Sequence, residues 1–294
     1  MKALHTYLIL FGGVFALSTS AIFVKIADAP SAVIAFYRLA IAALVLLPVL
    51  CLRADSRNEI PALRRDQWAR ITGAGGCLAL HYLLWFESLR YTSIASSTVI
   101  VCLQPVFSLA LERFVQNVRH RPAAWIGCCI ALVGSAVIGF GDFQISGQSL
   151  FGDMLAFLAA GVISLYFFLG QTVRQETSAV TYSVLSYSIS AVALLCYLLA
   201  RGDSLAGYSG GTWGAFLGLA LISTIGGQFI FNLLLKQLPA SAVTMSILGE
   251  PIGTCLLARL FLNESIVPQQ LMGIFLILGG LGLYFFLPKS RATG

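Results

Sequence analysis

The amino-acid sequence predicts an all-α integral membrane protein with ten transmembrane helices, arranged as two inverted five-helix repeats. Three observations support this fold class: the composition, the spacing of the apolar runs and an internal repeat. Of the 294 residues, 58% are hydrophobic and only 10% are charged, whereas soluble domains carry about 25% charged residues. Because a helix of about 20 apolar residues spans the hydrocarbon core of a bilayer, the number of such runs predicts the number of helices.

Apolar runs of this length occupy nearly the whole chain. The ten runs are residues 6–26, 31–52, 68–89, 92–115, 122–141, 150–173, 181–200, 212–236, 240–262 and 267–287. Several gaps between them are only a few residues long, so neighbouring helices are expected to form antiparallel hairpins. The polar stretch 141–149 separates the fifth run from the sixth and divides the chain into a first repeat at 1–141 and a second repeat at 150–287.

The internal repeat appears when the chain is compared with itself at a shift of 146 residues. This shift superposes Arg90 on Lys236, Thr98 on Thr244, Pro105 on Pro251, Arg113 on Arg259, Gly127 on Gly273 and Gly134 on Gly280. Since each half contains an odd number of runs, the second half enters the membrane from the opposite side. Inverted repeats of this kind are typical of transporters, whose binding site lies where the repeats meet near the middle of the membrane.

The distribution of positive charge predicts the orientation. Thirteen of the 18 Lys and Arg residues fall on the side of the two termini, and only Lys25, Arg90, Arg201 and Arg259 fall on the other. Because positive residues remain in the cytoplasm, both the N- and the C-terminus are predicted to be cytoplasmic. The net charge of +6 comes from Lys and Arg residues that lie mostly in the short gaps between apolar runs, which is the pattern of membrane orientation. Nucleic acid is therefore not an expected partner.

Motifs for catalysis or for a cofactor are missing from this sequence. It has no P-loop pattern for nucleotide phosphates, and its histidines, His5, His81 and His120, are too widely spaced for a metal motif. The seven cysteines lie within or beside apolar runs and form no CxxC pair, which is typical of small buried residues. We therefore expect no catalytic residue, no metal and no cofactor, and a protein that is not an enzyme.

Two prolines interrupt the fourth and ninth runs at equivalent positions of the repeat. Pro105 follows Gln104, and Pro251 follows Glu250. A proline inside a helix removes a backbone hydrogen bond and kinks the helix, so these pairs are candidates for symmetric hinges, with Glu250 also a candidate for coupling to a proton or another cation. The alternative is that the Gln104 and Glu250 side chains only satisfy the disturbed backbone.

One cation, Arg38, lies inside a predicted span, about a third of the way along the second run. A charge at the bilayer centre costs at least about 2.5–3.5 kcal/mol unless it faces a cavity or a partner. Arg38 is therefore a candidate to bind a substrate carboxylate, or it pairs with an acid such as Glu87. Its counterpart in the second repeat is Leu185, so this cation is present in one half only.

Aromatic and amide side chains on the third and eighth runs indicate a binding cavity. The third run places four aromatic-ring residues on one helix face: His81, Tyr82, Trp85 and Phe86. The repeat pairs Tyr82 with Gln228 and Phe86 with Asn232. Such faces suit an amphipathic molecule with a flat apolar part; alternatively they pack helices together or lie at the lipid interface. The remaining candidates for substrate binding are Thr98, Tyr166 and Thr244.

These features resemble the EamA-type family of the drug/metabolite transporter superfamily. The residues that carry the resemblance are Phe36-Tyr37-Arg38-Leu39, Pro105, Glu250-Pro251, Leu262-Asn263-Glu264-Ser265 and the glycines of the last run of each half. It extends over essentially the whole chain. The first half departs from the family pattern, because Gln104 replaces the acid that often precedes the proline and Val118 occupies the glutamate position of the helix-end motif.

The resemblance implies a ten-helix transporter of the cytoplasmic (inner) membrane, whose central cavity opens alternately to each side. The aromatic and hydrophobic amino-acid exporters of the YddG kind belong to this family, so the expected function is alternating-access export of small metabolites, neutral or aromatic amino acids above all. The alternatives are a transporter of sugar phosphates, nucleotide sugars or drugs and, from another class, a polytopic membrane enzyme. The expected partners are a small-molecule substrate and the lipid bilayer, with a monomeric protein and no obligate protein partner.

Overall fold

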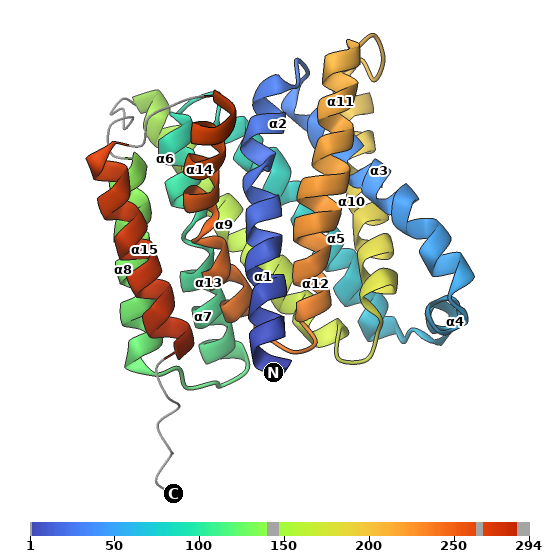
Figure 1. Ribbon diagram of the computed structural model, residues 1–294. Helices are drawn as coiled ribbons and strands as arrows, with labels where there is room; N and C mark the ends of the chain where they lie inside the picture. The colour runs from blue at the N-terminus through green and yellow to red at the C-terminus, as the bar shows by residue number, and fades with distance from the viewer. Residues whose placement is uncertain (1, 140–146, 263–266, 287–294) are drawn as a thin grey trace, which may run out of the picture.

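The computed structural model describes residues 2–139, 147–262 and 267–286, and these residues contain helices but no β-strand. Most of the predicted midpoint stretch 141–149, the helix-end residues 263–265 and the basic C-terminal tail lie outside the described residues. The first half contains α1 (Lys2–Ser18), α2 (Ser20–Ile26), α3 (Ser31–Leu52), α4 (Ala54–Ala62), α5 (Arg65–Ser88), α6 (Ile94–Val101), α7 (Gln104–Val115) and α8 (Pro122–Gly139) (Figure 1). The second half contains α9 (Gly147–Val173), α10 (Ala179–Arg201), α11 (Gly210–Gly218), the π-helical segment η2 (Leu219–Phe229), α12 (Ile230–Leu234), α13 (Ala240–Ile247), α14 (Glu250–Leu262) and α15 (Pro268–Phe286).

The described helices have the length and composition of membrane spans. Eight helical stretches among the described residues are long and apolar enough to cross a membrane, and the shorter stretch Pro122–Ile138 is apolar as well. The remaining predicted run corresponds to α5, which is 24 residues long but less apolar, because Arg65, Asp66 and Arg70 lie in its first two turns. The all-helical membrane fold is therefore confirmed, whereas the count of ten transmembrane helices stays a prediction.

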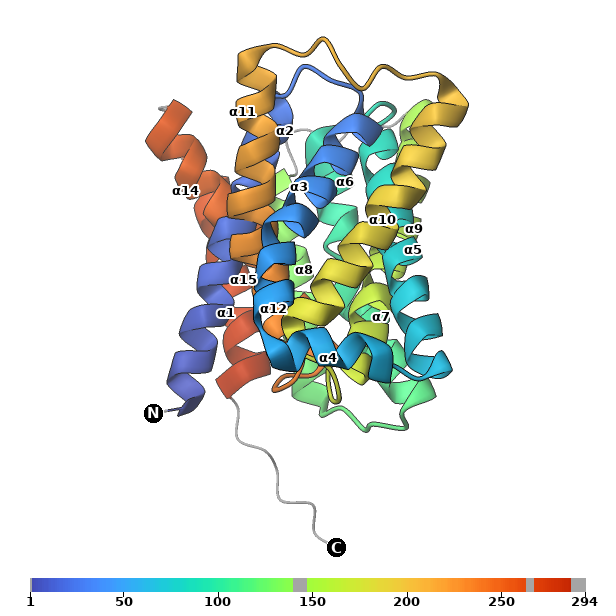
Figure 2. The same ribbon diagram turned by 90° about the vertical axis from the view of Figure 1, so that its right-hand side faces the viewer.

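The helices run up and down between two ends of one bundle (Figure 1, Figure 2). α1 begins and α15 ends at the same end, which also carries the short helix α4; we call it the α4 end. The α2–α3 connection, the start of α6 and the end of α14 lie at the opposite end, called here the α2–α3 end. This arrangement is the one that the predicted topology requires, and the assignment of the α4 end to the cytoplasm stays a prediction.

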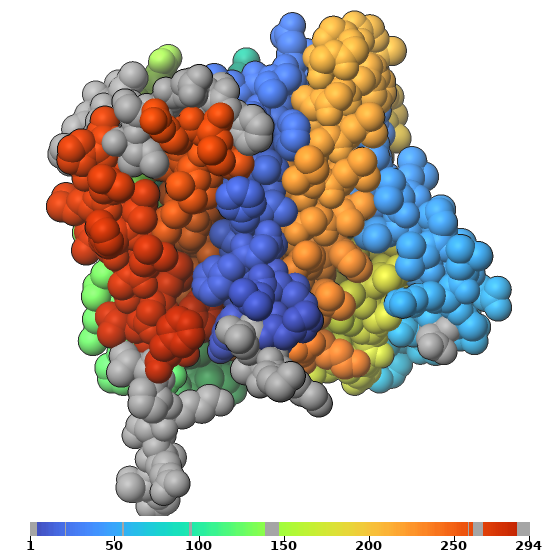
Figure 3. Space-filling view, viewed as in Figure 1, coloured from blue at the N-terminus to red at the C-terminus, as the bar shows by residue number. Residues whose placement is uncertain are grey.

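The two halves interlock instead of packing as separate domains. α1, from the first half, contacts η2, α12, α13 and α14 of the second half. Figure 3 shows α1 on the surface between α14–α15 on one side and the α11–α12 span on the other. In the other direction, α9 of the second half contacts α5, α6 and α7 of the first. The first helix of each half therefore packs against helices of the opposite half.

The last helices of the two halves, α8 and α15, pack against each other through repeat-related glycines. A Cβ atom placed on Gly127 would lie 2.6 Å from the Gly280 carbonyl oxygen, and one on Gly134 would lie 2.6 Å from that of Gly273. Only glycine permits so close an approach of two backbones. Since Gly127 meets Gly280 while Gly134 meets Gly273, the two helices are antiparallel, which supports the inverted repeat. The repeat boundaries at 141 and 150 remain a prediction.

Candidate functional site

The fourth and ninth runs are each broken near the middle. α6 ends at Val101 and α7 begins at Gln104, whereas α13 ends at Ile247 and α14 begins at Glu250. Each proline is the second residue of the helix after the break, where its missing N–H group removes one bond to the preceding helix. The interruptions predicted from the prolines are therefore present, and they place Gln104 and Glu250 at the N-termini of two half-helices.

A small cavity lies between these breaks and the neighbouring helices, with a volume of about 40 Å³. Eight of the predicted site residues line it: Arg38, His81, Tyr82, Trp85, Thr98, Gln104, Gln228 and Glu250. The sequence did not single out its other lining residues, which are Leu17, Ser20, Val101, Cys102, Ile163, Phe167 and Ile247. Small-molecule sites occupy roughly 300–1,000 Å³, so the described conformation is closed and holds little more than water.

Four buried polar atoms around this cavity have no hydrogen-bond partner among the described residues. Three are donors, the Arg38 Nη2, Trp85 Nε1 and Gln228 Nε2 atoms, and one is an acceptor, the Gln104 Oε1 atom. A buried polar group without a partner costs about 1–3 kcal/mol. The concentration of such groups at one cavity indicates a place where water or a polar ligand completes the hydrogen bonds.

Arg38 is held in the cavity wall by neutral groups. It is only 1% exposed, and its Nε and Nη1 atoms donate to the hydroxyls of Thr224 at 3.0 Å and Ser20 at 3.2 Å. The guanidinium also lies over the Tyr82 ring, 4.6 Å from the ring centroid. The alternative pairing with Glu87 is wrong for this structure, because Glu87 forms its ion pair with Arg90, 3.3 Å away.

The π-helical geometry of η2 provides the partner for Arg38. The Thr224 hydroxyl donates to the carbonyl of Leu219, five residues earlier, at 2.8 Å, so its lone pairs remain free to accept from the arginine. η2 is eleven residues long, longer than the single π-helical turns that are frequent at functional sites. Glu250 lines the same cavity and lies within electrostatic range of Arg38, so the cavity contains one cation and one acid.

The aromatic face of α5 contributes part of the cavity wall. His81 and Trp85 are stacked, with ring centroids 5.8 Å apart and an interplanar angle of 22°, and the His81 Nδ1 atom lies 3.0 Å from the carbonyl oxygen of Ala159. Phe86, one turn further along α5, packs against Tyr82 and Trp85 but does not line the cavity. A flat apolar group entering beside Trp85 would therefore meet an existing stack of rings.

Three further candidates, Asn232, Tyr166 and Thr244, lie away from the cavity, and the first two bind each other across neighbouring helices. The Asn232 Nδ2 atom donates to the hydroxyls of Tyr166 at 2.7 Å, Ser183 at 3.0 Å and Tyr187 at 3.2 Å, so Asn232 and Tyr166 belong to a buried network between helices. The Thr244 hydroxyl donates within its own helix, to the Ala240 carbonyl at 3.0 Å. For Asn232 the interhelical alternative left open by the sequence therefore describes this structure.

Sequence reasoning missed two buried charged residues at the α4 end. Arg174 is 2% exposed and donates to the carbonyls of Asn232 at 2.8 Å and Leu233 at 3.3 Å, so it caps the end of α12; burial lowers its pKa. Glu112 accepts bonds from the Ser241 backbone N–H at 2.8 Å and from the Ser241 hydroxyl at 2.7 Å, joining α7 to α13. A span-end charge looks like an ordinary loop charge in sequence, so no signal identified either residue.

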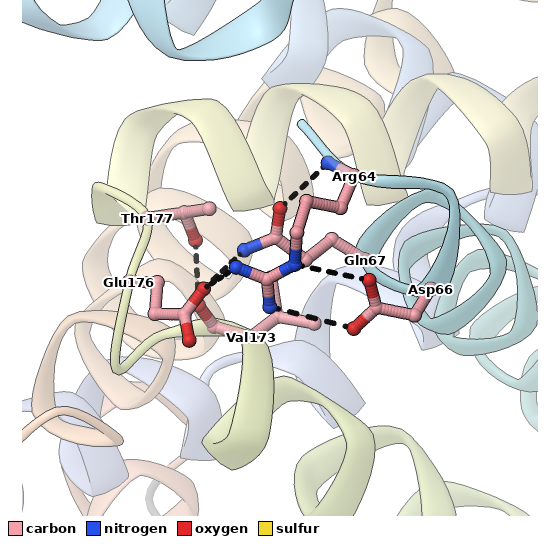
Figure 4. A network of polar contacts seen from close by, with 6 residues as sticks. All are labelled: Arg64, Asp66, Gln67, Val173, Glu176 and Thr177. Carbon is pink, nitrogen blue, oxygen red and sulfur yellow. Dashed lines mark hydrogen bonds and ion pairs between the residues drawn. The ribbon is translucent and has the colours of Figure 1, made fainter. Parts of the chain in front are cut away.

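An exposed polar network at the α4 end also joins the two halves (Figure 4). Glu176, after α9, accepts from Arg64 at 2.9 Å and from Gln67 at 2.6 Å, while Arg64 also pairs with Asp66 at 3.2 Å. The hydrogen bonds with Asp66 and Glu176 raise the pKa of Arg64. Polar grooves lie at the α4 end, with about 610 Å³ of space beside Glu176, and at the α2–α3 end, with about 440 Å³ beside Arg90. Both are much larger than the central cavity.

Comparison with known proteins agrees with this architecture. The model of the EamA-like transporter family matches residues 4–140 and again residues 150–286. Similar proteins include the uncharacterized transporter YwfM of Bacillus subtilis, 29% identical over 77% of this chain and 76% of that protein, and the uncharacterized transporter YyaM of the same organism, 25% identical over 95% and 93%.

A solved crystal structure shares the fold, with a TM-score of 0.78, 19% sequence identity and coverage of 96% of both chains. The two matches to the family model together cover nearly the whole chain, and the relatives are named as transporters. The apolar helices and this match make the protein a multi-pass membrane protein. The chain belongs to the EamA-like transporter family.

Proposed function

We propose that this protein is a monomeric, alternating-access secondary transporter that exports neutral amino acids, aromatic and hydrophobic ones above all, across the cytoplasmic membrane. The observation that carries the proposal is the closed central cavity, whose wall combines one cation, one acid, unpartnered polar atoms and a stack of aromatic rings. All of these groups come from a single chain, so no second copy is needed to complete the site.

The polar groups of the cavity match the two charges of an amino-acid zwitterion. The free Nη2 atom of Arg38 suits the carboxylate, because guanidinium–carboxylate hydrogen bonds are among the strongest in proteins. The Gln104 Oε1 atom and the Glu250 carboxylate suit the ammonium group. A side chain placed beside Trp85 would then contact apolar and aromatic surface, which favours hydrophobic over charged amino acids.

The size of the cavity supports alternating access. A cavity of about 40 Å³ cannot hold an amino acid, so helices must separate before a substrate binds, and the grooves at both ends provide the routes. The two half-helix breaks are the proposed hinges. Glu250 is the proposed group for coupling to a proton gradient, since it is an acid at the hinge and in the cavity together.

The proposed orientation places the α4 end in the cytoplasm, following the thirteen-to-four distribution of positive charge. Single cysteines introduced at Arg57 and near each terminus should be protected from an impermeant thiol reagent in intact cells, whereas one introduced in the 142–149 loop should react. Reaction at the termini in intact cells would contradict both the orientation and the inverted repeat.

The function is tested by efflux from proteoliposomes that contain the purified protein. A panel of labelled tryptophan, phenylalanine, leucine, glycine, tryptamine and a sugar phosphate should show transport of the apolar amino acids, with faster efflux when a pH gradient is imposed. Transport of the sugar phosphate with no transport of any amino acid would replace this proposal by the anionic-metabolite alternative. Empty liposomes and the Arg38→Gln variant are the controls.

A further inference from the structure

Two buried serines, Ser18 of α1 and Ser164 of α9, each reach a helix break in the opposite half of the protein. The Ser18 hydroxyl donates to the Glu250 carbonyl oxygen at 3.1 Å, and the Ser164 hydroxyl donates to the Gln104 carbonyl oxygen at 2.8 Å. Both serines are fully buried. They are separated by the repeat shift of 146 residues, as are Gln104 and Glu250, so the two contacts are copies of one contact, exchanged between halves.

Each serine also has a second acceptor on its own helix. The Ser18 hydroxyl lies 3.0 Å from the Val14 carbonyl oxygen, and the Ser164 hydroxyl lies 2.7 Å from that of Ala160. A hydroxyl group has only one proton to donate, so each serine bonds strongly to one carbonyl at a time. It can therefore release the carbonyl at the break and turn to its own helix without leaving a buried donor unsatisfied, which would cost far more.

The carbonyls at the breaks belong to the half-helices that follow them. Glu250 is the first residue of α14, which runs from the cavity towards the α2–α3 end, and Gln104 is the first residue of α7, which runs towards the α4 end (Figure 1). The Ser18 bond therefore joins α14 to α1, and the Ser164 bond joins α7 to α9. The two serines hold opposite ends of the pathway.

The packing around the contacts is also exchanged between halves. A Cβ atom on Gly253 of α14 would collide with Ser18 and would touch Phe15 of α1 at 3.7 Å, while one on Gly161 of α9 would touch Phe107 of α7 at 3.4 Å. Phe15 and Gly161, and likewise Phe107 and Gly253, are related by the same repeat shift. The absence of a side chain at Gly253 is what lets Ser18 approach the break.

We propose that Ser18 and Ser164 are paired latches that hold the closed state: the Ser18 hydroxyl retains α14 and the Ser164 hydroxyl retains α7, and each half-helix tilts open when its latch turns back to its own helix. This proposal rests on the alternating-access part of the proposed function and does not depend on which substrate moves. It assigns a positioning role to both serines, since neither lines the central cavity.

The consequence is that loss of one latch biases the protein towards opening at one end. Without the Ser18 hydroxyl, α14 is released while α7 stays fixed, so the α2–α3 end opens more often. Without the Ser164 hydroxyl, the α4 end opens more often. A merely structural serine would not give opposite effects at the two ends.

Amide hydrogen exchange measured by mass spectrometry tests the proposal, with the full-length protein in lipid nanodiscs. The reporters are peptides from residues 20–30 and 202–209 at the α2–α3 end, and from residues 53–64 and 174–178 at the α4 end. Loss of one hydrogen bond corresponds to a change of about two- to tenfold in the open population. Ser18→Ala should raise exchange by this factor at the α2–α3 end only, and Ser164→Ala at the α4 end only.

Two control variants separate a latch from a general packing effect. The Ser190 hydroxyl also lies between its own helix, 2.8 Å from the Ser186 carbonyl, and a neighbour, 2.6 Å from the Gly75 carbonyl of α5, but no helix break is involved. Ser190→Ala should leave the ratio of exchange at the two ends unchanged. Ser164→Thr keeps the hydroxyl and should behave as the unaltered protein.

Faster exchange at both ends in each single variant, or an unchanged ratio in both, would overturn the latch proposal. In the unaltered protein, the relative rates of amide hydrogen exchange at the two ends should change with conditions. If no condition changed them, alternating access itself would be refuted, and the latch proposal with it. Two interconverting populations in the unaltered protein, with no shift in either alanine variant, would overturn the latches alone and leave the transport proposal standing.

Discussion

The two helix breaks share one geometry but differ in chemistry. Gln104 and Glu250 occupy equivalent positions, and the carbonyl of each accepts a bond from a serine of the other half. At the second break the Thr254 hydroxyl also donates to the Glu250 carbonyl, at 3.1 Å, whereas the equivalent hydroxyl at the first break, that of Ser108, is buried and has no partner among the described residues. The acid is present at one break only.

If the proposed function holds, the repeat has kept the groups proposed to move the helices and has changed the groups proposed to contact the substrate. Prolines, serines and breaks are present in both halves, and an inverted pair of hinges needs that symmetry to open either end. Arg38, by contrast, corresponds to Leu185, and Glu250 corresponds to a neutral amide. A zwitterion has two different ends, so an asymmetric pair of charges orients it in a way that a symmetric pair would not.

Removing the cation should break this asymmetry with the largest effect. Arg38→Leu copies the residue of the second half, and because hydrogen bonds to charged groups contribute about 1.5–3 kcal/mol, amino-acid affinity should fall roughly 10- to 100-fold. Affinity and initial efflux rates in proteoliposomes at matched protein amounts measure this change. Tryptamine, which has no carboxylate, should be affected much less; an equal loss for tryptamine and tryptophan would refute a carboxylate site.

Making the two breaks chemically identical should remove coupling. Glu250→Gln reproduces the amide of the first break, and we expect binding to persist while the acceleration of efflux by a pH gradient disappears. The reverse variant, Gln104→Glu, adds an acid at the equivalent position and serves as the control for charge alone. If Glu250→Gln kept its full response to the gradient, Glu250 would not be the coupling group.

Repairing either break should slow the transport cycle. Pro105→Ala and Pro251→Ala each restore an N–H group that can bond to the preceding helix, which favours a continuous helix by about 0.5–1.5 kcal/mol. Exchange between the two open states should slow by about two- to tenfold with little change in substrate affinity, as measured by counterflow and equilibrium binding. Wild-type exchange rates in both variants would remove the hinge role.

The aromatic wall should affect one class of substrate only. Trp85→Ala removes a ring that stacks on His81, and stacking contributes about 0.5–1.5 kcal/mol beyond area burial when a second ring is present. Affinity for tryptophan and phenylalanine should therefore fall by about two- to tenfold more than affinity for leucine. The same loss for all three amino acids would indicate a packing role.

Alanine substitutions of Gln228 and Asn232 should have the smallest effects on transport. The two substitutions should differ in kind, because one should affect binding and the other stability. Gln228→Ala should weaken amino-acid binding by about two- to tenfold, because the free Nε2 atom of Gln228 faces the cavity. Asn232→Ala should leave binding unchanged and lower the unfolding free energy by about 1–3 kcal/mol, since it removes the buried hydrogen bonds from Asn232 to the hydroxyls of Tyr166, Ser183 and Tyr187. Affinity measurements and thermal unfolding in detergent distinguish these outcomes.

The sequence by itself determined the helical spans, the repeat, and most residues of the cavity wall. Composition and length suffice for the spans, because a bilayer accepts little besides apolar helices. A polar residue inside such a span must face a cavity or a partner, which is why Arg38, Gln104 and Glu250 were identifiable. Pro105 and Pro251 located the breaks, because each lacks the N–H group that would bond to the preceding turn; Pro48, by contrast, lies inside the uninterrupted helix α3, so a proline alone does not fix a break.

Only the tertiary structure decided which candidates reach the cavity. The members of each pair, Tyr82 and Phe86 on α5 and Gln228 and Asn232 on the eighth run, share a helix face but lie about 6 Å apart along the helix axis. Helical periodicity predicts the face of a residue and not its depth in the bundle. The cross-half contacts were equally hidden, because Ser18 meets Glu250 at a separation of 232 residues. Which buried hydroxyl meets which carbonyl depends on how distant helices pack, and one chain's local pattern does not encode that packing.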